Sequence, residues 1–343
     1  MSAPLLEVKN LKVEFPTRHG LLTAIDDVSF TIAPGEVLGV VGESGAGKSI
    51  TGTAIIGLLE PPGRIAQGEI LLNGKRIDNL SYDQMRAIRG REIGAIFQDP
   101  LTSLNPLYTV GRQLTETIQT HLDLSAEAAR KRAIELLAQT GIPAPDKRVD
   151  QYPHQFSGGM RQRVVIALAL AANPKLLIAD EPTTALDVSI QAQIIQLIKT
   201  LCREHGTAVM LVTHDMGVIA ETADRVAVMY AGRVAEIGPV SQVIHSPQHP
   251  YTRGLMGSIP KMGADVLRLA QIDGAMPRLN AIPSGCAFNP RCPQAMERCR
   301  KERPELLPTE TTHAACWLHS VEKPVITSSP LHGLSEGKML EDA

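Results

Sequence analysis

One stretch near the amino terminus carries the residue types that bind a triphosphate. Residues 42–49 read GESGAGKS, in which two glycines with four residues between them are followed by Lys and Ser. Such glycines let backbone amides surround phosphates at the start of a helix, while Lys48 can reach the β- and γ-phosphates and Ser49 can offer its hydroxyl to magnesium. The predicted phosphate site comprises Gly42, Glu43, Ser44, Gly45, Ala46, Gly47, Lys48, Ser49 and Ile50.

A second stretch supplies two carboxylates. Residues 176–181 read LLIADE, an apolar strand that ends in two acids. Because an unpaired charge at the end of a buried strand is costly, these acids need a cation nearby. We expect Asp180 to hold magnesium and Glu181 to orient and deprotonate the attacking water.

A third stretch predicts another anion site. Residues 156–163 read FSGGMRQR, and Ser157, Gly158 and Gly159 open a helix with no lysine beside them. One ATP does not need two such sites in one chain. The second site therefore points to a nucleotide held elsewhere.

The elements that must position these residues follow from apolar periodicity. Short apolar runs predict strands within residues 5–41, then at GEILLNG, EIGAIFQ, KLLIAD and AVMLVTH, with a hairpin around Ala231 and Gly232. Between Tyr108 and Ala172 the period becomes helical, and residues 188–205 predict an amphipathic helix ended by Gly206. The pattern is that of an α/β core with a helical insert.

These three stretches together resemble the ATP-binding cassette (ABC) superfamily, over roughly residues 5–240. The resemblance implies a P-loop NTPase (RecA-like) core with an antiparallel β subdomain and a helical subdomain at about 106–172, together filling residues 1–238. It also implies that Ser157, Gly158 and Gly159 contact the ATP of a partner cassette in a head-to-tail pair. By the same resemblance, four more positions match functional ones: Gln98 senses the magnesium, Asp187 belongs to the loop between cassettes, His214 contacts the γ-phosphate, and Phe15 stacks on adenine.

Composition limits the remaining possibilities. The 34 basic and 36 acidic residues nearly cancel, which argues against a nucleic-acid partner. The first ten residues lack an export signal, and the longest apolar run, residues 164–172, is about half the length needed to span a bilayer. We therefore expect a chain in the reducing cytosol, where clustered cysteines indicate a metal site before disulfides.

Four cysteines lie together in a proline-rich extension, residues 239–320. Cys286, Cys292, Cys299 and Cys316 are separated by five, six and sixteen residues, wider than the tight pairs of most zinc sites. Thiolate ligation also suits a [4Fe-4S] cluster. Iron-sulfur, zinc and metal-free cysteines all remain open, and Cys202 is expected to be a small buried hydrophobic residue. The tail, residues 321–343, is expected to be mobile.

The strings HSPQHPYTRGLM and CAFNPRCPQAMERC resemble the carboxy-terminal extension of dipeptide and oligopeptide importer ATPases. This resemblance favours the iron-sulfur interpretation. It implies an ATPase on the cytoplasmic side of a bacterial inner membrane, with a second related cassette, two permease subunits and an extracytoplasmic peptide-binding protein. Alternatives are an importer of nickel or another solute, a soluble ABC ATPase that acts without a transporter, and an iron-sulfur electron carrier.

Overall fold

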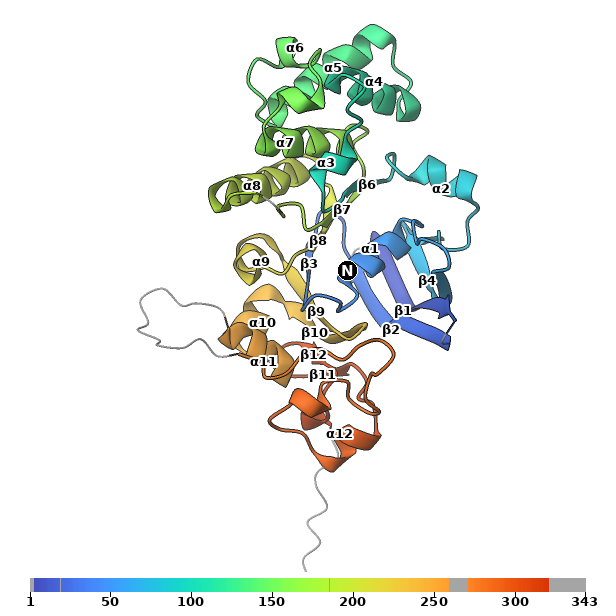
Figure 1. Cartoon of the computed structure of the whole chain (residues 1–343), viewed down its shortest axis with the longest axis vertical. Helices are drawn as coiled ribbons and strands as arrows, with labels where there is room; N and C mark the ends of the chain where they lie inside the picture. The colour runs from blue at the N-terminus through green and yellow to red at the C-terminus, as the bar shows by residue number, and fades with distance from the viewer. Residues whose placement is uncertain (1–2, 19, 185, 259–270, 321–343) are drawn as a thin grey trace, which may run out of the picture.

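The computed structural model describes residues 3–18, 20–184, 186–258 and 271–320. The molecule is elongated, with a helical part at one end, a carboxy-terminal extension at the other, and an antiparallel sheet beside the central core (Figure 1). The expected mobile tail at residues 321–343 lies outside the described residues.

The central sheet has eight strands in the order β11-β12-β10-β9-β3-β8-β7-β6. The strands β9, β3, β8, β7 and β6 run parallel to one another. The strand β10 runs antiparallel to β9, to which it is joined by the predicted hairpin. The strands with fully apolar runs, β3 and β8, are buried along their whole length, as strands covered on both faces must be. The strand bounds are β3 Val37–Val41, β6 Ile93–Ile96, β7 Leu176–Asp180, β8 Ala208–Val212, β9 Arg225–Tyr230, β10 Arg233–Pro239, β11 Leu307–Pro308 and β12 His313–Ala314.

The second sheet has the order β2-β1-β4-β5 and is antiparallel throughout. Residues of β1 alternate between buried and exposed over much of its length, because one face packs on the core and the other meets solvent. The bounds are β1 Leu6–Thr17, β2 Gly20–Ile32, β4 Arg64–Leu72 and β5 Lys75–Arg76. This sheet stands beside α1, Lys48–Ile55, the helix that follows the phosphate loop (Figure 1).

The helical part lies between β6 and β7 in the chain. Among the described residues, three of its helices begin at side-chain caps: Thr109, Ser125 and Ser157 each accept a hydrogen bond from the backbone amide three residues later. These contacts place the start of each helix. The bounds of the helices from β5 to β7 are α2 Tyr82–Ile88, α3 Pro100–Ser103, α4 Val110–His121, α5 Ala126–Gln139, α6 Pro145–Arg148, the 3-10 helix Pro153–Gln155 and α7 Gly158–Ala169.

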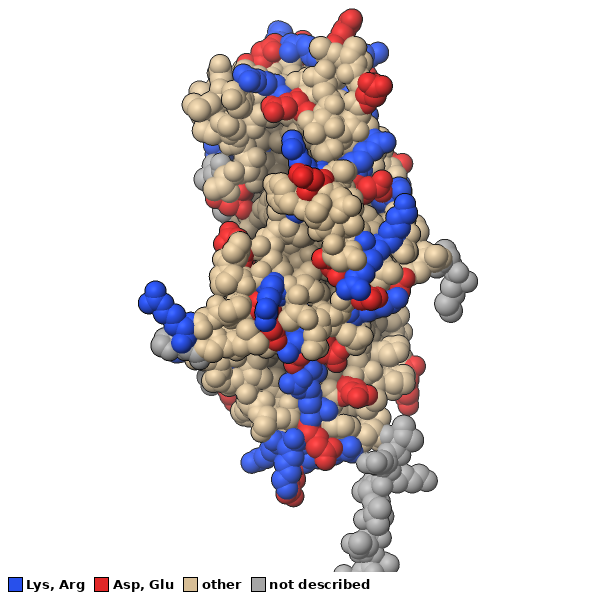
Figure 2. Space-filling model, turned by 90° about the vertical axis from the view of Figure 1, so that its right-hand side faces the viewer, with Lys and Arg blue, Asp and Glu red and all other residues tan. Residues whose placement is uncertain are grey.

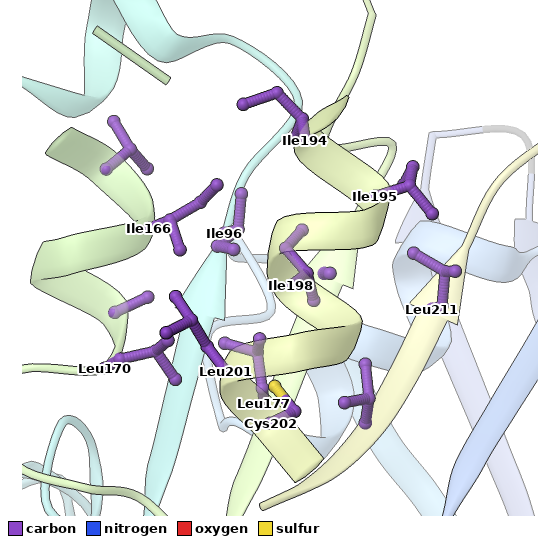
Figure 3. Packing of buried hydrophobic residues seen from close by; sticks show 14 of the residues in the cluster. Ile96, Ile166, Leu170, Leu177, Ile194, Ile195, Ile198, Leu201, Cys202 and Leu211 are labelled. Atoms are coloured by element: carbon purple, nitrogen blue, oxygen red, sulfur yellow. The ribbon is translucent and has the colours of Figure 1, made fainter. Parts of the chain in front are cut away.

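The helix α8, Val188–His205, joins the helical part to the central sheet, and it ends at Gly206 as predicted, with a left-handed φ of 67°. Figure 3 shows its apolar side chains packed against α7 and the core strands. Cys202 belongs to this cluster and is 1% exposed, which agrees with its expected role as a small hydrophobic residue, and burial raises the pKa of its thiol to about 12. The labelled side chains are Ile96, Ile166, Leu170, Leu177, Ile194, Ile195, Ile198, Leu201, Cys202 and Leu211.

The extension is continuous with the central sheet, because β12 pairs with β10. Glu236 of β10 is fully buried, and its carboxylate accepts hydrogen bonds from the Gln248 amide, the His249 amide and the Thr312 hydroxyl. These bonds satisfy a charge that would otherwise be costly to bury. The helices beyond β8 are α9 Met216–Thr222, α10 Val240–His245, α11 Pro250–Gly257, the 3-10 helix Asn289–Arg291, α12 Glu297–Lys301 and the 3-10 helix Trp317–His319.

Candidate ATP site

The predicted phosphate loop connects β3 to α1. Gly42, Gly45 and Gly47 have φ of 151°, 80° and 101°, backbone conformations that side chains disfavour. A Cβ atom at Gly42 would lie 2.3 Å from the Met229 carbonyl oxygen, so glycine is also required there for space. The loop is therefore shaped by its glycines, which let the backbone curve at the start of α1 in the way that an anion site requires.

Lys48 is the buried cation of this loop. Its side chain donates hydrogen bonds to the carbonyl oxygens of Gly42, at 2.8 Å, and Glu43, at 3.1 Å. Burial lowers the pKa of Lys48, and the carboxylates of Glu181 and Asp180 oppose that shift. An ammonium already inside the loop can turn to bind phosphate oxygens.

The two acids at the end of β7 lie beside the loop, as the sequence predicts. The Ser49 hydroxyl donates to Asp180 Oδ1 at 3.0 Å, so two of the three residues predicted at the magnesium, Ser49, Asp180 and Gln98, are in contact. Burial raises the pKa of Asp180, the Ser49 hydrogen bond opposes the shift, and the Glu181 charge adds to it. A hydroxyl and a carboxylate are hard oxygen donors of the kind that magnesium prefers, so these residues fit the ion.

Glu181 is the centre of a polar cluster. Gln98 Nε2 and Thr184 Oγ1 both donate to its Oε2 at 3.0 Å, and His214 Nδ1 lies 3.3 Å from its Oε1. Glu181 has a φ of 45°, an unfavourable conformation for a non-glycine residue and one often found at functional sites. Three positions named from the sequence, at residues 98, 181 and 214, thus meet at one point.

The second predicted anion site lies on α7, in the helical part of the molecule (Figure 1). Ser157 caps this helix, and Gly158 and Gly159 follow it. Among the described residues, those of α7 do not line the cavity over the phosphate loop. Asp187 caps α8 next to this site, since Gly159 faces Ile190 of the first turn of α8.

Phe15 lies on β1 and is partly buried against the core beneath the antiparallel sheet. A Cβ atom at Gly63 would lie 2.6 Å from its ring, so ring and loop are in close contact. Its predicted contact with adenine remains a prediction.

One wall of the phosphate cavity comes from the extension, which sequence reasoning did not find. Residues 276–279 line this cavity together with the phosphate loop, Gln98 and Glu181. Met276 closes over the loop so tightly that a Cβ atom at Gly45 would lie 3.1 Å from its methyl group. The loop and this segment are more than 200 residues apart in the chain, and residues 276–279 follow no phosphate-binding pattern that could have signalled the contact.

The four cysteines of the extension all line one small cavity, with Phe288 and Trp317 around them. Each is a free thiol, and burial raises the pKa of Cys286 and of Cys316 to about 11. Across the described residues, no group of three or more His, Cys, Asp or Glu side chains is placed to hold a metal ion. The predicted metal centre is therefore not shown, although the sulfur atoms face a common space.

On the face that Figure 2 shows, Lys and Arg side chains are interspersed with Asp and Glu over the length of the molecule. Of the helices within the described ranges, none is long and apolar enough to cross a membrane.

Comparisons with known proteins agree with the geometry. A family model described as "ABC transporter" matches residues 25–184, and one described as "Oligopeptide/dipeptide transporter, C-terminal region" matches residues 235–299. The oligopeptide transport ATP-binding protein OppD of Bacillus subtilis (strain 168) is 52% identical, over 94% of this chain and 91% of that protein. The dipeptide transport ATP-binding protein DppD of Escherichia coli (strain K12) is 49% identical, over 88% and 92%.

Solved structures of ABC cassettes also resemble this chain. The structure titled "Dimeric structure of a post-hydrolysis state of the ATP-binding cassette MJ0796 bound to ADP and Pi" is 32% identical, with a TM-score of 0.62, over 68% of this chain and 98% of that one. The structure titled "Structure of cbiO1 from clostridium perfringens: Part of the ABC transporter complex cbiONQ" is 30% identical, with a TM-score of 0.61, over 71% of this chain and 92% of that one.

Proposed function

The chain belongs to the ABC transporter family, as the ATP-binding subunit of a peptide or dipeptide importer. From that premise we propose how its residues bind and hydrolyse ATP. It is an ABC-type ATPase. The observation that carries the proposal is the meeting of Gln98, His214 and Glu181 beside the phosphate loop. Coupled to permeases, this site drives uptake of short peptides.

The ATP site divides its tasks among six side chains. Lys48 binds the β- and γ-phosphate oxygens, while Ser49 and Asp180 hold magnesium, which neutralises charge on the phosphates when it is bound. Glu181 accepts the proton of the attacking water, and Gln98 and His214 orient the Glu181 carboxylate and the γ-phosphate. The contacts between these residues support the assignment.

Each ATP site is completed by a second, related cassette. Ser157, Gly158 and Gly159 of one chain bind the γ-phosphate held by the other, and Asp187 lies at the junction. Phe15 stacks on adenine. The proposal rests on the separation of α7 from the phosphate cavity, which leaves that anion site without a nucleotide of its own. Since ATP bridges the two chains, it favours their closed state and thereby drives the change in the permeases.

The membrane partners follow from the same premise. We assign two permease subunits, an extracytoplasmic peptide-binding protein, and a location on the cytoplasmic side of the inner membrane. Near Gln98, Phe97 is 42% exposed and Leu107 is 79% exposed. Apolar side chains this exposed suit a docking surface for permease helices.

Uptake of labelled peptide tests the cargo. Cells that depend on this chain should accumulate a labelled dipeptide, and excess unlabelled dipeptides or oligopeptides should compete while nickel ions should not. Competition by nickel alone would contradict the peptide assignment and favour the metal-importer alternative.

The cysteines of the extension fit a [4Fe-4S] cluster. All four cysteines line one cavity, and in the sequence they are spaced more widely than the tight ligand pairs of most zinc sites, which supports thiolate ligation of an iron-sulfur cluster. When bound, the cluster supplies a cross-link between loops that have little core of their own. Burial disfavours free thiolates at Cys286 and Cys316, so a cation is needed to hold them ionised.

Anaerobic purification tests this cofactor. The full chain should be brown and contain about four irons per molecule, as a cluster held by four thiolates requires. The Cys292→Ser variant should lose most of this iron, whereas Cys202→Ser should keep it, because Cys202 lies on the core-facing side of α8. A colourless chain with one zinc, or iron unaffected by Cys292→Ser, would contradict the assignment.

A further inference from the structure

The phosphate loop is held from outside the cassette core by the extension. Arg291 of the extension places one guanidinium nitrogen 3.1 Å from both carboxylate oxygens of Glu43, the second residue of the loop. The Arg291 side chain is only 7% exposed. The Glu43 side chain is 28% exposed, so the pair is partly buried, and removing Glu43 would leave the more buried Arg291 charge without its partner.

Arg291 is itself fixed in place by other groups. Its Nε donates to the Asp273 carbonyl oxygen at 2.9 Å, and its Nη1 also donates to the Tyr230 hydroxyl at 3.3 Å. These contacts use separate edges of the guanidinium, which leaves little freedom for the group to turn away from Glu43. The geometry of the pair is therefore set by the fold of the extension.

The backbone of Glu43 is held as well as its side chain. Its amide donates to the Tyr251 hydroxyl at 3.0 Å, and Tyr251 is fully buried on α11. The Tyr251 ring packs on Tyr230 at 4.6 Å and on Phe288 at 5.4 Å between centroids. Three rings from the hairpin, α11 and the cysteine-containing loop thus support one residue of the phosphate loop.

We propose that Arg291 is a positioning residue of the ATP site: it holds Glu43, and through it the phosphate loop, in the conformation that receives the triphosphate. Arg291 also neutralises the Glu43 carboxylate, which would otherwise repel the phosphates. ATP affinity therefore depends on the fold of the extension, and Arg291 directly precedes Cys292 of the cysteine cavity. The inference rests on the ATP site proposed above.

Arg291→Ala should weaken ATP binding to the purified full chain by about 10-fold, within the usual range for coupled sites. In the importer, the KM for ATP should rise by about the same factor while kcat changes by less than about 3-fold, because Arg291 does not touch the reacting atoms. The matched control is Arg298→Ala. Arg298 also precedes a cysteine, but it pairs with Glu302 and lies over Trp317, and its substitution should leave ATP affinity unchanged.

A second variant approaches the pair from the loop. Glu43→Gln removes the charge that Arg291 neutralises, so adding Arg291→Ala to it should change ATP affinity by less than about 2-fold. Equal losses in Arg291→Ala and Arg298→Ala, or an undiminished effect of Arg291→Ala in the Glu43→Gln chain, would overturn the proposal. Thermal unfolding of each variant identifies losses that come from misfolding.

Because coupling between two sites is reciprocal, the proposal can also be tested without measuring ATP affinity. If the extension favours ATP binding, ATP must stabilise the extension by the same coupling free energy. Hydrogen exchange of residues 286–299 should slow when ATP binds the normal chain and should not slow in Arg291→Ala at matched ATP occupancy. The Lys48→Ala variant distinguishes failure of the proposed ATP site from failure of the proposed role of Arg291. If Lys48→Ala binds ATP normally, the assignment of the ATP site is wrong. If Lys48→Ala loses ATP binding and Arg291→Ala does not, only the coupling between the extension and the site is wrong.

Discussion

Replacing Glu181 by glutamine should lower ATP hydrolysis by about 10²- to 10⁴-fold, the usual contribution of a positioned general base. Glutamine keeps the size and one carbonyl oxygen, so the hydrogen bond from Gln98 can persist. It has no basic oxygen to take a proton from water. Binding of ATP should survive, because Lys48 and Ser49 are untouched. We expect the variant to accumulate with ATP trapped between two cassettes.

The measurement is single-turnover hydrolysis of labelled ATP, with bound nucleotide counted separately. Glu92→Gln is a suitable control, since Glu92 pairs with Lys175 at 3.0 Å near the start of β7, at the opposite end of that strand from Glu181. The Glu92→Gln substitution should leave the rate of ATP hydrolysis unchanged. Normal turnover in Glu181→Gln would remove Glu181 from the role of base, and loss of ATP binding would show that it serves the phosphates instead.

The parts of this site that sequence predicts are those with local causes. The phosphate loop depends on glycines and a lysine within eight residues, and β7 delivers Asp180 and Glu181 because an apolar run ends there. A parallel sheet then brings the ends of its strands to one edge, which is why Gln98 after β6 and His214 after β8 meet Glu181. Period and turn chemistry suffice for the phosphate loop and for the two acids of β7, whereas Gln98 and His214 are predicted from the family resemblance.

The contacts that sequence did not predict are long-range. The pair between Glu43 and Arg291 joins residues 248 positions apart, and nothing in the neighbourhood of either residue distinguishes it from a surface charge. The strand β12 has two residues and no apolar alternation, yet it extends the central sheet by pairing with β10. Tertiary packing determines these features, and no local pattern in the sequence signals them.

Gly158→Asp should abolish ATP-driven pairing of cassettes while each chain still binds ATP. The first turn of α7 offers amides and a positive helix end to an anion, and a carboxylate at its start would occupy that place. A like charge about 4 Å from the γ-phosphate costs several kcal/mol, which predicts a loss of pairing and hydrolysis of about 10²- to 10³-fold. The phosphate loop of the same chain is unaffected.

The space around Gly158 should let the Gly158→Asp chain fold normally. A Cβ atom at Gly158 would lie no closer than 3.8 Å to a neighbouring side chain, that of Leu186, and an acidic residue in the first helical turn stabilises a helix. The fold should therefore tolerate Asp there. Gly158→Ala, which adds the same Cβ without charge, is the control and should pair nearly normally. The measurement is light scattering with ATP in the Glu181→Gln background, where the closed pair persists. Unchanged pairing in Gly158→Asp would mean that α7 does not bind the partner's nucleotide, and equal loss in both variants would show a steric cause and remove the anion site.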